Sequence, residues 1–492
     1  SQLAIDILVS KYFRKAGVPV TGHETSVRQV IQRITHTIRD AGVRMGYFDA
    51  DSARVFEEEL AYLLIHQRGA SNSPVWFNVG VEPKPQCSAC FILSVDDTMN
   101  SILDWYRKEG VIFKGGSGSG VNLSNIRSSR EPLVGGGTAS GPVSFMRAAD
   151  ASAGVIKSGG KTRRAAKMVV LNIDHPDVEE FIRCKGDEEK KAWALIDAGY
   201  DGAIDGEAYG SVFFQNANNS VRVTDEFMHA VEADADWSTR NVIDGKPNRT
   251  LKARRLWNMI AEQAHFCGDP GLQFDTTIND WHTCPESGRI NASNPCSEYM
   301  FLDDTACNLA SLNLLKFLKD DDTFDAVKFA KSVELIITAM DISICFADFP
   351  TEPIGDTTRK FRQLGIGYAN LGALLMATGL PYDSDAGRAF AAAITSLMTG
   401  TAYKRSAEIA GVVGPYEGYA RNAEAHQRVM RKHAAATDLV RTASTLDAEV
   451  LSLAAKAWAE GNEIGARNGW RNAQASVLAP TGTIGFMMDC DT

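Results

Sequence analysis

The stretch MVVLNIDHPDVEEFIRC, residues 168–184, joins a short apolar run to an amphipathic segment. The run MVVLNI has the length and the Val and Ile content of a buried strand, whereas HPDVEEFIRC spaces its apolar residues as a helix does. A strand followed directly by a helix is the repeating unit of a parallel α/β sheet. This stretch therefore predicts an α/β fold with parallel strands.

The same alternation continues on both sides of this stretch. From Ser71 onward, short apolar runs such as CFILSV, SVRVTD and ACNLASLNL alternate with glycine-rich turns and with helical stretches such as MNSILDWYRKE and DEFMHAVEA. Longer apolar helices are predicted at Ser332–Phe349 and Ala386–Ala410, and an Ala-rich stretch with one apolar stripe covers 429–461. We predict one α/β core over residues 71–492.

The residues before this core read as helices. VRQVIQRITHTIRDAG and DADSARVFEEELAYLLIHQRG both place apolar residues three and four positions apart. Asp51 is a candidate N-cap of the second helix, and Gly69 is a candidate for the position just after its end. We therefore predict a separate N-terminal helical region over residues 1–70.

The composition excludes several classes of protein. The chain has 492 residues, 44% of them hydrophobic, with no apolar run near the roughly 18 residues that would indicate a membrane span. It has 51 basic and 61 acidic residues, a net charge of −10, which argues against binding to a nucleic-acid backbone. The first residues lack a signal-peptide core, so we expect a reducing, cytoplasmic compartment.

Nine cysteines in a chain of this length are too few for a disulfide framework, and most are expected to be buried thiols. Cys87 and Cys90 form a C-x-x-C pair. No second such pair exists to complete a four-thiolate zinc site, and the pair precedes a strand, whereas thioredoxin-like motifs open a helix. On the residues alone, two incidental buried thiols fit as well as a reactive pair.

The segment Asn294-Pro295-Cys296-Ser297-Glu298 is more informative. Pro295 moves Asn294 out of the helical region of backbone space, so the segment is predicted to be loop or extended chain. Alternate positions of an extended chain project to one side, which would bring amide, thiol and carboxylate together. Such a set can exchange an electron or hydrogen atom, move a proton and orient a hydroxyl. The alternative is a loop with a buried cysteine and a surface glutamate.

Three glycine-rich stretches suggest backbone that approaches an anionic ligand. GVIKSGGKT (154–162) has five residues between Gly154 and Gly160 and precedes a strand. The phosphate-binding loop of ATPases has four residues between these glycines and is followed by a helix, so this stretch does not match that motif. KGGSGSG (114–120) is no better as a dinucleotide fingerprint. APTGTIG (479–485) can hold a phosphate through its backbone N–H groups, or it is simply a turn.

Together these motifs resemble the catalytic chain of ribonucleotide reductases, most closely the class II, adenosylcobalamin-dependent type. The resemblance runs through SPVWFN, QCSACFIL, FKGGSGSGVNLSNIR, KSGGKTRRAAKMVVLNI, GDPGLQF, SNPCSEYMFLDDTACNLASLNL and APTGTIG. The assignment to class II rests on the residue sequences NPCSEYMFLDD and ACNLASLNL. The resemblance implies a ten-stranded α/β barrel with a central finger loop that carries Cys296, preceded by the N-terminal helical region.

The resemblance also implies catalytic roles. Cys296 matches the cysteine whose thiyl radical abstracts the ribose 3′-hydrogen, Glu298 the base for the 3′-hydroxyl, and Asn294 the residue that hydrogen-bonds the substrate hydroxyls. Cys90 and Cys307 match the dithiol that supplies two electrons and ends as a disulfide. Substrate contacts are implied for Ser73, Ala89 and Gly118, and diphosphate contacts for Thr481, Gly482, Thr483 and Ile484.

The family has a nucleotide effector site at a dimer interface, which selects the base to be reduced. Asp97 matches the contact to the effector's deoxyribose, and Lys114 and Arg127 match phosphate-side contacts. Ser158–Ala166 resembles the mobile loop that relays effector identity, and Ser158, Lys161 and Arg163 are its implied contacts. For Asp97 the alternative is an acidic pair with Asp96 at a helix N-terminus.

The implied function is reduction of ribonucleoside di- or triphosphates to the 2′-deoxy form, for DNA precursor synthesis. The implied partners are the ribonucleotide, a dNTP or ATP effector, a thioredoxin-like or small dithiol reductant and a second copy in a homodimer; no metal, nucleic acid or membrane is expected.

Two alternatives stay open. One is a class I large subunit, which takes its radical from a separate metal-bearing subunit. The other is an inactive nucleotide-binding fragment of a split or trimmed reductase. The family continues beyond APTGTIG with a last barrel strand and, in many members, a cysteine-bearing tail, so we expect a chain truncated at its C-terminal end.

Overall fold

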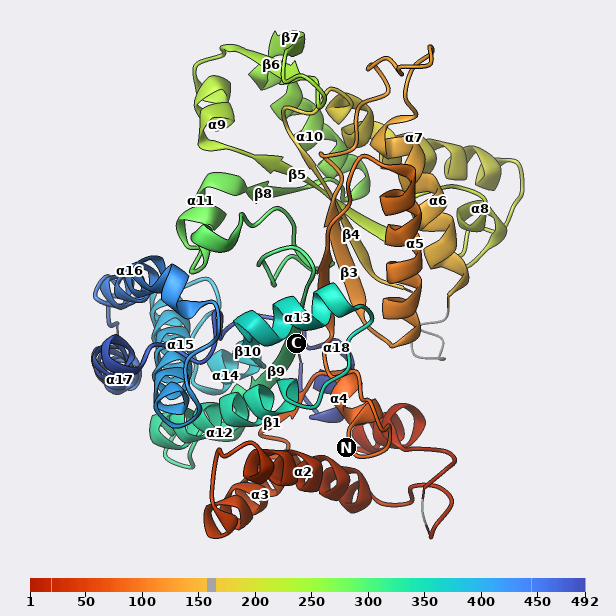
Figure 1. Ribbon diagram of the computed structural model, residues 1–492. Helices are drawn as coiled ribbons and strands as arrows, with labels where there is room; N and C mark the ends of the chain where they lie inside the picture. The colour runs from red at the N-terminus through yellow and green to blue at the C-terminus, as the bar shows by residue number, and fades with distance from the viewer. Residues whose placement is uncertain (19, 157–164, 444, 492) are drawn as a thin grey trace. The chain divides into compact units, whose positions relative to one another are not determined.

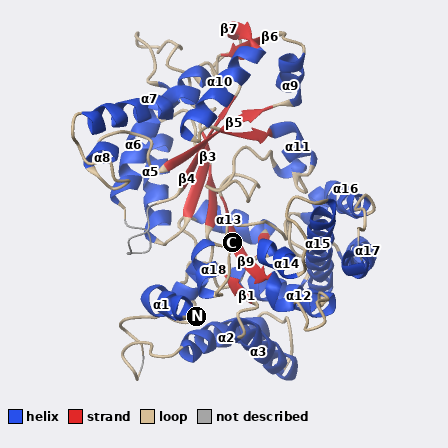
Figure 2. Ribbon diagram, turned by 180° about the vertical axis from the view of Figure 1, so that it is seen from behind, coloured by secondary structure: helices blue, strands red, loops and turns tan. Residues whose placement is uncertain are grey.

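The computed structural model describes residues 1–18, 20–156, 165–443 and 445–491 (Figures 1 and 2). The chain divides into two compact units. Unit 1 comprises Ser1–Ala89, His282–Gly288 and Ala306–Thr492, and unit 2 comprises Cys90–Trp281 and Arg289–Thr305. Each unit therefore contains segments that are far apart in the sequence.

Unit 2 is built on a parallel sheet with the strand order β2-β3-β4-β5-β8. These strands are Cys90–Leu93, Gly118–Asn122, Lys167–Asn172, Ala217–Val223 and Gly271–Phe274. Helices α5 (Met99–Lys114), α6 (Gly141–Val155) and α7 (Val178–Asp197) lie along one side of it (Figure 1). The opening stretch 168–184 is β4 followed by α7, so the predicted parallel α/β fold is confirmed.

The rest of unit 2 consists of a separate two-stranded sheet and helices. A two-stranded antiparallel ribbon pairs β6 with β7. The remaining elements are α8 (Glu207–Gly210), α9 (Asp225–Glu232), β6 (Asp236–Arg240), β7 (Pro247–Lys252), α10 (Ala253–Cys267) and α11 (Asp275–Asp280).

Unit 1 is mainly helical around three strands. The central strand β9 (Thr305–Asn313) is buried along its whole length, pairs antiparallel with β1 (Gly69–Ser71) and pairs parallel with β10 (Leu364–Ala369). Helices α15, α16 and α17 lie side by side (Figures 1 and 2). The α-helices are α1 (Gln2–Ile7), α2 (Val27–Arg44), α3 (Ala50–Ile65), α4 (Ser73–Asn78), α12 (Ala326–Ile344), α13 (Glu352–Phe361), α14 (Leu371–Ala377), α15 (Asp385–Val413), α16 (Tyr419–Thr437), α17 (Thr445–Asn468) and α18 (Gly482–Met487). The shorter helical segments are η1 (Leu8–Tyr12), η2 (Pro285–Ser287) and η3 (Leu314–Phe317).

The N-terminal residues are helical as predicted, but two details differ. The N-cap of α3 is Asp49, whose carboxylate accepts a hydrogen bond from the Ser52 backbone N–H at 2.8 Å, so Asp51 lies in the first turn instead. Gly69 does not follow the end of a helix, because it begins strand β1. Helices α2 and α3 pack against α12 within unit 1. The proposed division at residue 70 stays a prediction.

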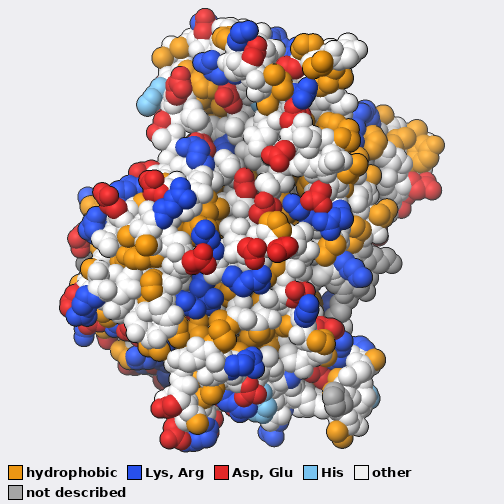
Figure 3. Space-filling model, in the orientation of Figure 1, with side chains coloured by type: hydrophobic (Ala, Val, Ile, Leu, Met, Phe, Trp, Pro, Cys, Tyr) orange, Lys and Arg blue, Asp and Glu red, His pale blue; other side chains and the backbone are white. Residues whose placement is uncertain are grey.

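The structure also differs from the prediction at residues 429–461, which were expected to share one apolar stripe. Helix α16 ends at Thr437 and α17 begins at Thr445, so the stripe belongs to two helices. No helix in the described ranges is long and apolar enough to cross a membrane. On the face shown in Figure 3, acidic and basic side chains are interspersed with hydrophobic ones.

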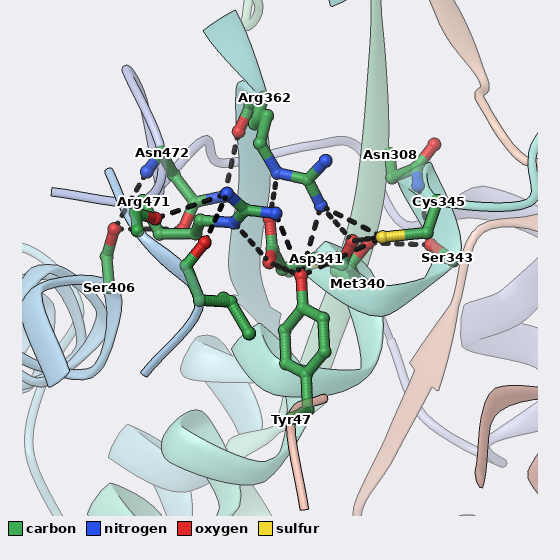
Figure 4. A network of polar contacts seen from close by, with 12 residues as sticks. Tyr47, Asn308, Met340, Asp341, Ser343, Cys345, Arg362, Ser406, Arg471 and Asn472 are labelled. Atoms are coloured by element: carbon green, nitrogen blue, oxygen red, sulfur yellow. Dashed lines mark hydrogen bonds and ion pairs between the residues drawn. The ribbon is translucent and has the colours of Figure 1, made fainter. Parts of the chain in front are cut away.

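A buried charge network holds unit 1 together (Figure 4). The carboxylate of Asp341 on α12 is fully buried and accepts hydrogen bonds from Arg362 Nε at 2.8 Å and Arg471 Nε at 3.2 Å. Asn472 Nδ2 donates to it at 2.8 Å, and the Tyr47 hydroxyl also donates to it. Burial alone raises the pKa of Asp341, but the two arginines outweigh burial and hold that pKa below its ordinary value.

We predict that Asp341→Ala destabilises unit 1 by about 3–5 kcal/mol, because it leaves two buried arginines without a counter-charge. Hydrogen exchange of α12 and β10 peptides, followed by mass spectrometry, measures this loss of protection. The control is Asp385→Ala, which removes an exposed partner of Arg388 and is expected to change stability by at most about 0.5 kcal/mol. Equal protection in both variants would contradict the role of the network.

Candidate active site

The NPCSE loop, defined here as residues 289–304, contains neither helix nor strand along its described length. It lies against the sheet of unit 2: Asn122 Nδ2 donates to the Asn291 carbonyl and Asn218 Nδ2 to the Pro295 carbonyl, each at 2.8 Å. A Cβ atom on Gly120 would lie 1.6 Å from the Ser293 carbonyl oxygen. A Cβ atom on Gly118 would lie 2.7 Å from Pro295. Gly118 and Gly120 of KGGSGSG therefore leave the space in which the loop backbone packs against the sheet. This role was not predicted from the sequence.

The tip of the NPCSE loop is a closed turn. The Ser297 N–H donates to the Asn294 carbonyl at 3.1 Å, and Ser297 has a left-handed φ of +63°. The Asn294 side chain also accepts a hydrogen bond from the Tyr299 N–H at 2.9 Å. An extended chain was one expectation for this segment, and it is wrong, because the turn folds the segment back on itself. Cys296 is exposed at this tip, whereas Asn294 and Pro295 are buried.

Two of the predicted catalytic residues meet a third in unit 2. Asn294 Nδ2 donates to Cys90 Sγ at 3.0 Å, and the Cys90 thiol donates to Glu298 Oε1 at 3.7 Å. The other carboxylate oxygen, Glu298 Oε2, is buried and has no hydrogen-bond partner among the described residues. An amide, a thiol and a carboxylate thus converge, but the thiol in these contacts is that of Cys90 on strand β2, whereas the prediction named that of Cys296.

The electrostatics of this cluster suit proton transfer. Burial raises the pKa of Glu298, and the hydrogen bonds from its own backbone, Asn294 and Cys90 offset only part of that shift. A carboxyl with a raised pKa holds a proton more readily than one in water. Such groups are typical of general acids and bases.

The remaining catalytic residue, Cys307, lies in unit 1. It is fully buried in strand β9, and its carbonyl accepts a hydrogen bond from the Ala89 N–H at 3.2 Å. None of the nine cysteines, all of which the structure describes, is in a disulfide. Cys90 and Cys307 belong to different units, so their pairing stays a prediction. Cys87 is buried, and burial raises the pKa of its thiol.

The predicted substrate residues of unit 1 occupy two places. Ser73 begins α4, with its hydroxyl 3.0 Å from that of Tyr12. Thr481 precedes α18 with a φ of +53°, and its hydroxyl lies 2.7 Å from that of Ser311. Gly482, Thr483 and Ile484 form the first turn of α18, where backbone N–H groups have no partner within the helix. In unit 2, Gly118 pairs in register with Cys90.

The predicted effector residues are only partly brought together. Asp97, just before α5, forms an ion pair with Arg127, with a Nε–Oδ2 distance of 2.5 Å. Lys114 is the last residue of α5, so it lies about 24 Å along the helix axis from Asp97. Ser158, Lys161 and Arg163 lie outside the described residues.

Sequence analysis missed two residues behind the loop. Arg222 and Gln273 lie on β5 and β8 and hydrogen-bond to each other at 2.9 Å. Arg222 lies in SVRVTD, which was predicted only to be a strand, and Gln273 lies in GDPGLQF, which contributed only to the family resemblance. An arginine within a buried strand was the one available signal, because a buried charge requires partners.

Comparison with known proteins agrees with this geometry. Residues 88–492 match the family model described as "Ribonucleotide reductase, barrel domain". The chain is therefore a member of the ribonucleotide reductases. Residues 1–67 match the model described as "Class II vitamin B12-dependent ribonucleotide reductase".

Three curated relatives carry the name "Vitamin B12-dependent ribonucleotide reductase". The protein of Streptomyces avermitilis is 62% identical over 99% of this chain and 51% of its own length. Those of Rhodopirellula baltica and Agrobacterium fabrum are 52% and 40% identical over 100% of this chain and 50% of their own lengths. The chain belongs to the class II, vitamin B12-dependent family, which confirms the resemblance and favours it over class I. It spans about half the length of these relatives.

We predict that Glu298→Gln stabilises the protein increasingly as pH rises. A carboxyl whose folded pKa exceeds its ordinary value of 4.5 binds more protons when folded, so the wild-type protein loses stability progressively as pH rises from 4.5 to the folded pKa and keeps that loss at higher pH. The variant lacks this cost. Thermal unfolding of both proteins between pH 4.5 and 8 measures the difference, and a difference independent of pH would contradict the raised pKa.

Proposed function

We propose that this chain carries the catalytic groups for reduction of ribonucleoside di- or triphosphates to 2′-deoxyribonucleotides, in DNA precursor synthesis. The observation that carries the proposal is the convergence of Asn294 and Glu298 on Cys90, on a loop that exposes Cys296. Each group has the chemistry that the reaction needs, and membership of the class II family supports the assignment.

The reaction replaces a 2′-hydroxyl by hydrogen, which consumes two electrons and releases water. A thiyl radical on Cys296 takes the hydrogen atom from C3′ and returns it at the end of the reaction, which restores the radical, and Glu298 accepts the 3′-hydroxyl proton while Asn294 orients the substrate hydroxyls. The thiols of Cys90 and Cys307 supply two electrons and two protons and become a disulfide. The Cys90 thiol already donates to Glu298, so this carboxylate can exchange protons with both substrate and thiol.

Adenosylcobalamin, when bound, supplies the initiating radical through homolysis of its cobalt–carbon bond. The chain fits this requirement, because Cys296 is exposed while Cys90 and Cys307 are buried. The exposed thiol can therefore be reached from outside, whereas the reducing pair is protected. The orphaned Glu298 Oε2 fits a substrate hydroxyl as its missing partner.

The finer architecture is part of the proposal. We assign a ten-stranded barrel whose centre is threaded by the NPCSE loop, as a finger loop. Support comes from the five parallel strands of unit 2 and from the approach of the loop to Gly118 and Gly120. Residues 1–70 would form the separate N-terminal helical region and 71–492 the barrel.

Substrate, effector and partners follow the family pattern. The backbone N–H groups of Gly482, Thr483 and Ile484 would hold the diphosphate, with Ser73, Ala89, Gly118 and Thr481 as further substrate contacts. Asp97 and Arg127 would contact a dNTP or ATP effector between two copies of the chain, with Lys114, Ser158, Lys161 and Arg163 completing that site. A thioredoxin-like or small dithiol reductant would regenerate the thiols.

A second candidate is a nucleotide-binding part of a longer reductase that is inactive alone. The observation that favours it is the coverage of about half the length of the relatives. The two candidates share all nucleotide contacts and differ only in turnover.

We predict that adenosylcobalamin supports formation of deoxyribonucleotide by this chain with dithiothreitol as reductant. Product analysis by chromatography, with and without adenosylcobalamin, measures this dependence. Thermal stabilisation by dTTP without turnover would instead support the second candidate. Turnover without adenosylcobalamin would contradict the proposed source of the radical.

We predict that Cys296→Ala reduces turnover to background and that Cys307→Ser stops multiple turnover under a protein reductant, because it removes one half of the dithiol that supplies the two electrons. Counting deoxynucleotides formed per chain separates the two effects. Cys87→Ser, a buried cysteine beside the proposed pair, is the matched control and is expected to keep multiple turnover. Loss of turnover in Cys87→Ser alone would mean that the reducing pair is misassigned.

A further inference from the structure

The proposed chemistry needs Cys296 held in one place at the tip of an irregular loop. Ser297, the next residue, has a left-handed φ of +63°, which a residue with a side chain rarely adopts unless its surroundings impose it. Two backbone hydrogen bonds close the tip turn, from the Ser297 N–H to the Asn294 carbonyl and from the Asn294 N–H to the Tyr299 carbonyl, each at 3.1 Å. Side chains of the sheet and the loop add further hydrogen bonds to this conformation.

Gln273 supplies that restraint from strand β8. Its side chain is buried, and Nε2 donates to Ser293 Oγ at 2.8 Å and to Ser297 Oγ at 3.3 Å. An amide nitrogen has two N–H groups, so both are used on the loop. Ser293 Oγ in turn donates to the Asn294 carbonyl at 2.9 Å. The two serines thus hold the turn on both sides of Cys296.

Arg222 fixes Gln273 in turn. Its side chain is 2% exposed, and Nη1 donates to Gln273 Oε1 at 2.9 Å while Nε donates to Asp275 Oδ1 at 2.7 Å. The third nitrogen, Nη2, donates to the Ile290 carbonyl at 2.6 Å, near the beginning of the NPCSE loop. Arg222 therefore contacts the base of the loop directly and its tip through Gln273.

From these contacts we infer that Gln273 and Arg222 are positioning residues, which hold the turn Asn294–Ser297 so that the Cys296 thiol keeps its working position. The inference deepens the proposed function and rests on it for the role of Cys296. Both residues act through Ser293, Ser297 and the loop backbone. The strained φ of Ser297 is then maintained by side-chain hydrogen bonds that a sheet residue provides.

The test compares Gln273→Leu, Ser297→Ala and the double variant with the wild-type chain. Both single changes remove the hydrogen bond between Gln273 and Ser297, so each is expected to raise hydrogen exchange in peptides covering 293–299 by at least about tenfold. Exchange in β4 is expected to stay unchanged. The double variant is expected to show little increase beyond Gln273→Leu, because Gln273→Leu already removes the hydrogen bond from Gln273 that Ser297→Ala would break.

Two further measurements separate positioning from a general structural role. The rate at which iodoacetamide alkylates Cys296, located by mass spectrometry, is expected to change in both single variants. With adenosylcobalamin present, kcat is expected to fall about 10–100-fold while KM changes little, since misplacement of a reacting group costs rate. Gln263→Leu, at another glutamine of unit 2 on helix α10, is the matched control and should leave all of these values unchanged.

The outcomes are distinct from those of the proposed function. Unchanged exchange and alkylation in Gln273→Leu and Ser297→Ala would overturn the inference, whatever the activity. Fully additive effects in the double variant would also overturn it. If the loop responds as expected but the wild-type chain shows no turnover, the positioning role stands and the proposed activity fails. Ser297→Ala lies in the loop, so it keeps the test open if Gln273→Leu disturbs the sheet.

Discussion

Unit 2 depends on one buried cation. Placing the guanidinium of Arg222 among parallel strands is costly unless each of its nitrogens finds a partner. The partners are Asp275, Gln273 and the Ile290 carbonyl, which come from α11, β8 and the NPCSE loop. The sheet and the loop can therefore satisfy this charge only when they are assembled together. A loop without regular structure is thereby fixed by hydrogen bonds to the strands beneath it.

Unit 1 uses the same principle with the opposite sign. The buried carboxylate of Asp341 gathers Arg362, Arg471, Asn472 and Tyr47 from well-separated parts of the chain (Figure 4). Neither buried charge belongs to the proposed reacting groups. Each charge ties together separate segments of its own unit, and in unit 2 those segments include the loop that exposes Cys296. The proposed radical chemistry would need both exposure and restraint, since the thiol must be reached and must also be held.

Local structure could be predicted from the sequence, whereas contacts between residues far apart in the chain could not. The strand and helix of 168–184 were predictable because periodicity is a local property, and the motif around Cys296 carried the family. The contact between Asn294 and Cys90 spans 204 residues, so no spacing rule could indicate it. Gly118 and Gly120 resembled ligand-binding glycines, yet the chain that approaches them is the NPCSE loop. An arginine within a buried strand indicated that Arg222 has polar partners, but only the folded structure shows which residues they are.

The interrupted sequence of unit 1 has a consequence for biosynthesis. Strand β1 can pair only after β9 has been synthesised, because Gly69 pairs with Leu312. Helices α2 and α3 likewise cannot pack against α12 until α12 has been synthesised. The strands β2 to β8 of unit 2 are complete once Phe274 has been synthesised. Unit 2 also needs residues 289–305, whose Ile290 carbonyl accepts from Arg222, so it can fold only once Thr305 has been synthesised, but still before α12 is made. Until α12 follows, the faces of α2 and α3 that pack against it stay uncovered, and chaperones can protect them in the nascent chain.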